Sequence, residues 1–275
     1  MVAALAKVPV RIAHFRSDGI GGRGGGRRRI VLAISRALIE KFATRIIGVA
    51  PSALESGWRA DWRRDPRCFI IANGIDASRL RNLSATSRST RPTPESELVV
   101  ANIGRIEPSK NRARAIRIWQ ELASKRPSTL YLVGELNARD RSQLVETAKV
   151  ILKASRIVEV GDTSDVTSYL GRSHVLLVTS MREGLPGVVL ESLAVGVPVV
   201  GSQLPGIEWI GSRAEGVTVL PLEATDQEWA HAVWTASATN SSTIRQSFDN
   251  GPFLLEKSTR EFEVLWSVNQ RHGSA

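Results

Sequence analysis

The sequence predicts an α/β fold with an open, doubly wound parallel sheet, and two observations lead to this prediction. From residue 98 onward, short apolar runs alternate with helical patterns at the spacing of strand–helix–strand units. The segment 175–200 contains one such unit: an apolar strand, a loop rich in glycine and proline, an apolar-faced helix ending at Gly196, and a second strand. We therefore expect the strand-to-helix loops to form the ligand edge of the sheet.

The N-terminal part shows a less regular alternation of the same kind. Strands are expected at 8–14, 45–50 and 67–71, and helices at 30–42 and 52–62. The segment 19–26 holds six glycines in eight positions but lacks the Lys-Ser/Thr ending of a phosphate-binding loop, so we interpret it as a loop. Asn73-Gly74 predicts a tight turn, because these residues tolerate positive φ.

The segment 84–97 is rich in Ser, Thr, Pro and Arg without an apolar period, and it is the best linker candidate. After it, strands are expected at 98–103, 129–133, 156–160, 175–179, 197–201 and 217–220. Helices are expected at 114–124, 139–153, 165–171, 188–195, 226–236 and 256–268. These patterns predict an N-terminal domain at 1–92, a second domain at 93–253, and a C-terminal helix at 254–275 that crosses back to the first domain.

Composition narrows the class of protein. The 275 residues carry a net charge of +10, which suits an anionic small ligand, an anionic membrane surface or nucleic acid. No recognition helix, zinc finger or RNA-binding signature accompanies the charge, so we expect no nucleic-acid partner and favour loose contact with an anionic membrane. The single Cys68 excludes a disulfide framework and a cysteine-based zinc cluster. No apolar run has the length of a membrane span, and a cytoplasmic setting, peripheral at the inner membrane face, is expected.

Two loops carry the candidate chemistry. In the first, at 180–187, a strand leads into the N-terminus of a helix, where free N–H groups and the helix dipole favour an anion. Glu183 and Glu191 lie eight positions apart there, and we expect them to bind hydroxyl groups, as acidic residues do with ribose. In the second loop, at 104–110, Arg105 and Lys110 form a clamp suited to a diphosphate. Taken singly, these charges could equally be solvated surface residues.

The stretch Glu183-Gly-Leu-Pro-Gly-Val-Val-Leu-Glu191, followed by Gly196-Val-Pro-Val, resembles the Glu-x7-Glu signature of retaining GT-B glycosyltransferases, in particular family 4 (group 1). Asn73-Gly-Ile-Asp76 is similar to a motif that precedes the second domain in that family. The resemblance implies a GT-B-like fold with a complete C-terminal Rossmann-like domain and a truncated N-terminal one. It departs from the family pattern at Gly134-Glu-Leu-Asn, which replaces Gly-x-Gly, and at Ser192, which replaces Ala.

The resemblance also implies a set of site residues. His14 and Glu183 are expected to be catalytic, with His14 facing the donor sugar, and the loop with Asp162 is expected to contact the nucleotide base. The expected donor-binding residues are Gly104, Arg105, Lys110, Asp162, Glu183, Gly184, Leu185, Pro186, Gly187, Val188 and Glu191. No metal and no cofactor are expected, because the substrate is itself a nucleotide-diphosphate sugar.

The function expected from the resemblance is a retaining, metal-independent glycosyltransferase. It would move a sugar from a nucleotide-diphosphate sugar to a sugar or lipid-linked acceptor in polysaccharide or glycoconjugate biosynthesis. One alternative is a non-catalytic donor-binding half whose N-terminal domain is completed by a partner chain. A GT-B sugar-nucleotide epimerase and a nucleic-acid binder are further alternatives; the epimerases lack the Glu-x7-Glu pattern.

Overall fold

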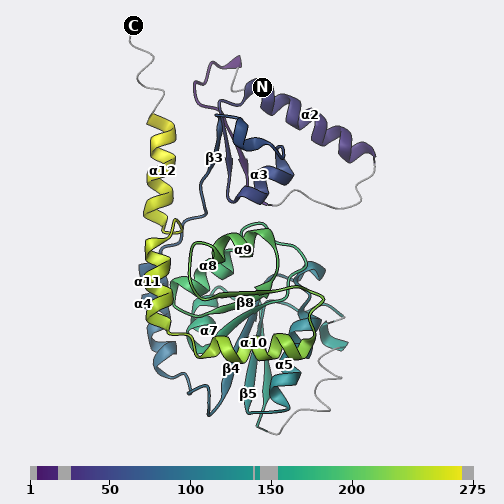
Figure 1. Ribbon diagram of the computed structural model, residues 1–275, viewed down its shortest axis with the longest axis vertical. Coiled ribbons are helices and arrows are strands. Elements are labelled where there is room, and N and C mark those ends of the chain that lie inside the picture. The colour runs from purple at the N-terminus through teal and green to yellow at the C-terminus, as the bar shows by residue number, and fades with distance from the viewer. Residues whose placement is uncertain (1–4, 18–25, 139, 143–153, 268–275) are drawn as a thin grey trace. The chain divides into compact units, whose positions relative to one another are not determined.

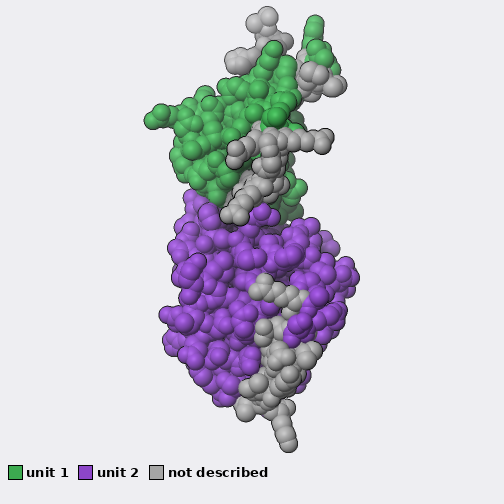
Figure 2. All heavy atoms as spheres, turned by 90° about the vertical axis from the view of Figure 1, so that its right-hand side faces the viewer, with its two compact units in different colours: residues 1–74, 255–275 green, residues 75–254 purple. Residues whose placement is uncertain are grey.

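The computed structural model describes residues 5–17, 26–138, 140–142 and 154–267. The chain divides into two compact units, one formed by residues 1–74 and 255–275 and the other by residues 75–254, which Figure 2 colours separately. The boundary between them falls at 74/75, whereas the sequence pattern places a domain boundary at 92/93.

The first unit is built on a three-stranded parallel sheet in the order β1-β2-β3. Its strands are β1 (Ile12–Phe15), β2 (Arg45–Gly48) and β3 (Cys68–Ile70). Its helices are α2 (Gly26–Phe42), α3 (Pro51–Gly57), the short 3-10 helix η1 (Trp62–Arg64) and α12 (Leu255–Ser267). All three strands and the helices at 30–42 and 256–268 agree with the sequence prediction within a few residues.

Two small apolar clusters hold this unit together. Ile46, Leu54 and Trp58 pack with Trp62, while Ile47 and Ile71 pack with Leu265 of α12. Because Ile46 and Ile47 are successive residues of β2, their side chains point to opposite faces of the sheet. The sheet is therefore covered on both sides, with α12 over one of them.

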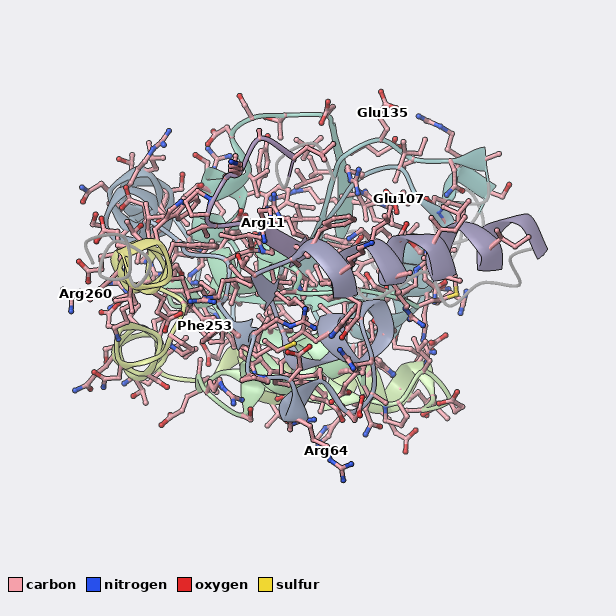
Figure 3. The ribbon with its side chains drawn as sticks, turned by 90° about the horizontal axis from the view of Figure 1, so that it is seen from above. Arg11, Arg64, Glu107, Glu135, Phe253 and Arg260 are labelled. Atoms are coloured by element: carbon pink, nitrogen blue, oxygen red, sulfur yellow. The ribbon has the colours of Figure 1, made fainter. Side chains whose placement is uncertain are left out.

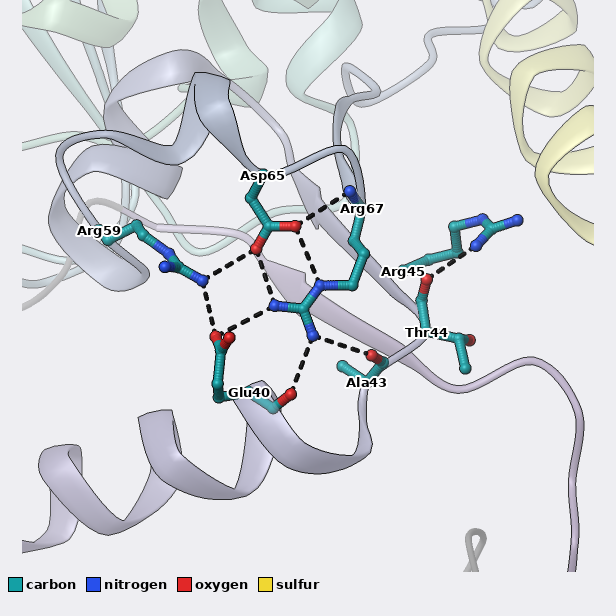
Figure 4. A network of polar contacts seen from close by, with 7 residues as sticks. All are labelled: Glu40, Ala43, Thr44, Arg45, Arg59, Asp65 and Arg67. Carbon is teal, nitrogen blue, oxygen red and sulfur yellow. Dashed lines mark hydrogen bonds and ion pairs between the residues drawn. The ribbon is translucent and has the colours of Figure 1, made fainter.

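A charged network lies just before the start of β3 (Figure 4). Asp65 accepts hydrogen bonds from the guanidinium groups of Arg67 and Arg59, and both arginines also contact Glu40 of α2. The same Arg67 donates to the carbonyls of Glu40 and Ala43. The network ties the end of α2 to the segment that leads into β3.

The prediction of a tight turn at Asn73-Gly74 is wrong. Neither residue has a positive φ, and the backbone runs on to a bridge between Ile75 and Leu254. Gly74 is needed for a different reason, since a Cβ there would lie 2.6 Å from the Cα of Leu255. The glycine permits a close backbone approach and not a left-handed turn.

The second unit contains a six-stranded parallel sheet in the order β6-β5-β4-β7-β8-β9 (Figure 1). Its strands are β4 (Leu98–Ile103), β5 (Ser128–Val133), β6 (Arg156–Gly161), β7 (Val175–Val178), β8 (Val199–Ser202) and β9 (Val217–Leu220). This is the doubly wound order, in which the chain starts in the middle, builds outward, and returns to build the other half. The predicted fold class is confirmed.

Helices cover both faces of this sheet. They are α4 (Ala77–Ser89), η2 (Pro108–Lys110), α5 (Arg112–Ala123), α7 (Val166–Arg172), α8 (Gly187–Ala194), α9 (Pro205–Gly211), α10 (Asp226–Ser237) and α11 (Ser241–Asn250). The main core joins α5 and α10 to the strands through residues such as Trp119 and Trp229, both fully buried. On the other side α7 and α8 contact the strands, with α4 and α11 packed against them. Helices α9 and α11 were not expected.

The prediction of a linker at 84–97 is wrong for residues 84–89. Residues 84–89 continue α4, and Ser84 and Ser87 are buried against α7. A Cβ on Gly171 of α7 would lie 2.9 Å from the Ser84 carbonyl oxygen, so the two helices touch through small residues. This contact explains why the helix shows no apolar period.

Two expectations fall outside the described residues: the glycine-rich loop at 19–26, apart from Gly26, and most of the helix at 139–153. Among the helices that the structure describes, none is long and apolar enough to cross a membrane.

Candidate functional site

The candidate site lies where β4 and β7 are neighbours. All pairings in this sheet are parallel, so the loops after the strands share one edge. After β4 the chain leads to α5, on one face, and after β7 it leads to α8, on the other. The two loops diverge at this point, which is the switch point where open α/β sheets bind ligands.

A dense set of contacts joins these two loops. The Nζ of Lys110 lies 2.6 Å from Oε1 of Glu183, and the Ser180 hydroxyl donates to the same oxygen at 2.6 Å. The Thr179 hydroxyl donates to the carbonyl of Lys110 at 3.2 Å, and the Met181 amide donates to that of Ser109 at 2.7 Å. The side chains of Lys110 and Glu183 are only 18% and 12% exposed. The structure thus brings together two of the site residues expected from the sequence, one from each loop.

Arg105 lies apart from that ion pair. Its side chain is 85% exposed and pairs with Glu107 of the same loop at 2.9 Å. The expected clamp of Arg105 with Lys110 is therefore not closed here: one cation is held by Glu183, and the other extends into solvent beside a pocket.

That pocket, of about 400 Å³, opens at the ends of β4, β5 and β6. Figure 3 labels Glu107 and Glu135 in the loops that follow β4 and β5. The expected residues Gly104, Arg105 and Asp162 line the pocket, and Glu135 and Thr163 contribute further polar groups. Ile103, Ile106, Val133, Gly134 and Val166 complete the lining. A lining that is mainly apolar, with a few polar groups, suits a flat heterocyclic ring.

The N-terminus of α8 forms the second part of the site. Helix α8 starts at Gly187 after Pro186, and no side chain caps this end. In its first turn the Val189 N–H donates to the Pro186 carbonyl at 3.1 Å, whereas the N–H groups of Gly187 and Val188 have no partner among the described residues. The space above Gly187 is open except for the Glu191 carboxylate, whose Oε1 lies 3.9 Å from where a Cβ would be. Glu191 therefore reaches back toward the start of its helix.

The Glu191 carboxylate makes no hydrogen bond or ion pair with any residue that the structure describes. Its side chain is half-buried, and burial raises the pKa of this carboxyl group. A half-buried acceptor without a partner is costly in the free protein. It is available to a donor group such as a hydroxyl.

The loop before α8 is held in place by α9. Leu185 and Pro186 are buried, and Gly184 lies close to Gly206 at the start of α9. A Cβ on Gly206 would lie 1.5 Å from the Gly184 carbonyl oxygen. The path of the loop toward Gly187 therefore depends on a glycine that the sequence patterns did not single out.

Arg112 is a second residue near the site that the sequence analysis missed. It is the first residue of α5, is 2% exposed, and donates to the carbonyls of Gly104, Val133 and Gly134. No local signal marks it, because an arginine at a helix start in an arginine-rich chain would be expected in solvent.

His14 lies on β1 of the first unit and is exposed there. Its ring meets that of Phe262 edge-to-face, with 6.0 Å between centroids. Although the residue as a whole is exposed, partial desolvation of the ring, followed by the charge of Arg16, lowers the pKa of His14.

In the part of the chain that the structure describes, no three side chains of His, Cys, Asp and Glu gather as a metal site would require. Cys68 is a free thiol, and burial together with the nearby Asp65 raises its pKa to about 11. It is therefore an unreactive thiol at neutral pH.

Comparison with known proteins adds to this geometry. The family described as "Glycosyl transferases group 1" matches residues 97–238, which is just over half of the chain. The lipopolysaccharide core biosynthesis glycosyltransferase LpsE of Rhizobium meliloti is 27% identical over 216 residues, covering 78% of this chain and 58% of that protein. The putative glycosyltransferase EpsF of Bacillus subtilis is 26% identical over 253 residues, covering 86% and 62%. The chain thus spans about three-fifths of the length of these curated relatives.

Solved structures share the fold. HepE of Anabaena, determined in complex with UDP and glucose, superposes with a TM-score of 0.71 at 20% identity, covering 96% of this chain and 73% of that one. Sucrose-phosphate synthase of Thermosynechococcus elongatus superposes with a TM-score of 0.70 at 17% identity, covering 94% and 68%.

Proposed function

The chain belongs to the group 1 glycosyl transferases, and from this premise we propose that it binds a nucleotide-diphosphate sugar and transfers the sugar to an acceptor with retention of configuration and without a metal ion. The observation that carries the proposal is the contact between Lys110 and Glu183. In it a cation from the loop after β4 meets a carboxylate from the loop after β7, and the second of these loops leads into α8.

Each part of a donor has a suitable place in the proposal. The base occupies the part of the pocket lined by Asp162 and Thr163, and the diphosphate lies at the part lined by Arg105 and Glu135. The diphosphate contacts Lys110, Arg105 and the free N–H groups at the start of α8, where the helix dipole favours an anion. Glu191 accepts hydrogen bonds from the ribose, and Glu183 accepts them from the sugar. The role expected for His14 stays a prediction, which its alanine variant tests.

The proposed chemistry needs no protein nucleophile. The bond between the anomeric carbon and the diphosphate oxygen breaks, and a new bond forms from an acceptor hydroxyl oxygen to that carbon on the same face. The acceptor proton passes to the departing phosphate oxygen. The chain contributes electrostatic stabilisation, since Lys110 and Arg105 offset the negative charge that develops on the leaving group.

The names of relatives support a role in polysaccharide or glycoconjugate assembly. LpsE is named for lipopolysaccharide core biosynthesis, and another relative, VipC/TviE of Salmonella typhi, for Vi polysaccharide biosynthesis. We propose a sugar or lipid-linked acceptor of that kind. HepE was solved with UDP, which makes UDP the first nucleotide to test.

Isothermal titration calorimetry of the chain against UDP, GDP and ADP, without added metal, tests the donor site. Micromolar binding of one nucleotide by the folded protein supports the proposal and identifies the base. If none of the three binds, the donor site is wrong. Repeating the titration of the nucleotide that binds in the presence of EDTA tests metal independence, because EDTA would lower the nucleotide affinity of a metal-dependent site.

A second candidate is a donor-binding chain that turns over only with a partner polypeptide. One observation favours it: among the described residues β1 pairs with β2 alone, and a groove lined by Ile12, Leu38 and Phe42 lies against β1. An open strand edge beside apolar side chains is a site for another strand. Co-purification with a small α/β protein that restores transfer would favour this candidate over the first.

We also propose cytoplasmic, peripheral contact with anionic membranes, supported by the net charge of +10. Co-sedimentation with phosphatidylglycerol vesicles, abolished by high salt and absent with neutral vesicles, would support this contact. Equal binding to both kinds of vesicle, or to neither, would contradict it.

A further inference from the structure

The guanidinium of Arg112 is not part of the lining of the pocket at the ends of β4, β5 and β6, but it binds the backbone of residues that line it. Its NH2 donates to the carbonyl of Val133 at 2.6 Å and to that of Gly104, and its NH1 donates to the carbonyl of Gly134 at 3.2 Å. Gly104 and Gly134 are the first residues after β4 and β5, and both line the pocket. One side chain thus holds the backbone at the ends of two neighbouring strands.

These hydrogen bonds fix which way the following N–H groups point. The described residues contain no cis peptide bond, and in a planar trans peptide the C=O and the next N–H point in opposite directions. Because the carbonyls of Gly104 and Gly134 point to Arg112, the N–H groups of Arg105 and Glu135 point away from it. Both residues line the pocket, and neither N–H has a hydrogen-bond partner among the described residues. They are free donors for an acceptor in the pocket.

The charge of Arg112 is not neutralised by an ion pair with any described residue. The nearest influence of opposite sign is Asp140, but its carboxylate accepts hydrogen bonds from the amides of Ala113 and Asn137. In addition, Nε of Arg112 is buried without a partner. Burying a guanidinium against carbonyls alone is expensive, and an apolar side chain would fill such a site at lower cost. The free-energy cost of burying this charge is explained if the charge attracts a ligand.

We propose that Arg112 is a positioning residue for an anionic ligand: it aims the N–H groups of Arg105 and Glu135 into the pocket and keeps a positive charge beneath them. This inference rests on the proposed function, in which that ligand is the diphosphate of the donor. The positive ends of the two peptides and the buried guanidinium then act together on the phosphate oxygens.

The test compares Arg112→Met, Arg112→Lys and Arg114→Met. Arg114 provides a control, because it lies two residues further along α5, is also buried, and also donates to two carbonyls, those of Leu222 and Ala224, while its charge is paired with Asp226. Both arginines therefore have a structural role, but only Arg112 lies under the pocket. Calorimetry measures binding of UDP, GDP and ADP, of the three matching nucleosides, and of inorganic pyrophosphate, and thermal unfolding measures stability.

Arg112→Met should weaken diphosphate and pyrophosphate binding about tenfold or more and nucleoside binding less, because the charge and the aimed N–H groups act on phosphate. Arg112→Lys should recover part of the loss, and Arg114→Met should leave affinity within about twofold while lowering stability. Equal losses for Arg112→Met and Arg114→Met, or for nucleoside and nucleoside diphosphate, would overturn the proposal. If Arg112→Met does not fold, Arg112→Gln, which also removes the charge, takes its place, and wild-type pyrophosphate affinity in that variant would overturn the proposal.

Pyrophosphate separates this inference from the proposed function. If the chain binds pyrophosphate in an Arg112-dependent manner but none of the three nucleotides, the donor assignment fails and the anion site stands. If wild-type protein binds neither pyrophosphate nor any nucleotide, both fail.

Discussion

Lys110 and Glu183 are 73 positions apart in the chain, yet their charged atoms lie 2.6 Å from each other across two loops. The pair is largely shielded from solvent, so its attraction is screened less than that of a surface pair. In the free protein the cation is already neutralised. A diphosphate that binds Lys110 therefore competes with Glu183 for this cation. A sugar that binds Glu183 weakens the ion pair and makes Lys110 available to the diphosphate. The two proposed binding roles are therefore coupled.

Lys110→Ala is expected to lower affinity for the donor nucleotide at least tenfold, about 1.4 kcal/mol, because the cation nearest the proposed diphosphate is lost. Calorimetry with the nucleotide that wild-type protein binds measures the change. Lys125→Ala is the control, since Lys125 is exposed just beyond the end of α5. The nucleotide affinity of this variant should equal that of wild-type protein. Unchanged affinity in a folded Lys110→Ala protein would contradict the donor assignment.

Glu191→Gln is expected to stabilise the free protein while weakening nucleotide binding. Burial raises the pKa of Glu191, so its ionised form is disfavoured in the folded state and folding stability falls as pH rises through the folded pKa. Removing the charge should therefore add on the order of 1 kcal/mol at neutral pH. The gain should shrink as pH falls toward the ordinary pKa of a glutamate, where wild-type protein is protonated too.

Urea unfolding at neutral and mildly acidic pH measures this difference, and calorimetry measures the nucleotide affinity. A variant that is less stable than wild type at neutral pH would show that Glu191 has a stabilising partner. A variant that is more stable and binds normally would remove Glu191 from the ribose role.

Gly134→Ala and Gly161→Ala form a pair for comparison, since Gly134 directly follows β5 and Gly161 ends the neighbouring β6, both with positive φ, +103° and +71°. A Cβ on Gly134 would lie 2.0 Å from the Gly104 carbonyl oxygen and 2.6 Å from NH2 of Arg112, whereas one on Gly161 would meet nothing within 4 Å. Gly161→Ala should cost only backbone strain, about 1 kcal/mol. Gly134→Ala should cost roughly 2 kcal/mol or more and weaken nucleotide binding as well.

Thermal unfolding and calorimetry on both variants check this prediction. Equal costs would mean that the carbonyl of Gly104 moves freely, and the pocket would not depend on the contact beneath it.

Local sequence patterns predict much of the sheet and of the loops that carry the candidate site. The apolar runs that became β4, β7 and β9 mark a parallel sheet, and Gly, Pro and acidic residues mark the loops at its carboxyl edge. Once the strands are parallel, the loops with Lys110 and Glu183 must lie at one edge. The pairing of β4 with β7 then brings them together.

Features that depend on distant contacts could not be predicted in this way. Arg112 is buried because three carbonyls from other segments surround it, and none of them is visible in its local sequence. The first part of 84–97 resembles a linker because α4 packs through Ser84 and Ser87, whose small size allows close approach but gives no apolar period. Gly74 resembles a turn residue, yet it is required only by the nearby backbone of Leu255.

The network around Asp65 should make the first unit sensitive to acid (Figure 4). Hydrogen bonds from Arg67 are the main cause that lowers the pKa of Asp65 from 3.8 to about 2. A depressed carboxyl pKa stabilises the fold above the unfolded value, and this stabilisation is lost as pH falls from about 4 toward 2. Allowing for solvent around Glu40 and Arg59, the contribution is on the order of 1 kcal/mol.

Asp65→Asn should remove that contribution at neutral pH and flatten the pH dependence between about 4 and 2. Amide hydrogen exchange in β2 and β3, measured on the full chain, reports on this unit alone. Glu55→Gln is the control, because Glu55 pairs with Arg63 at the surface, where the side chains are 45% and 61% exposed, and should change stability by less than about 0.5 kcal/mol. If both variants exchange at the wild-type rate, the buried acceptor of Arg67 contributes no more than an exposed ion pair, and the acid sensitivity must come from other carboxylates.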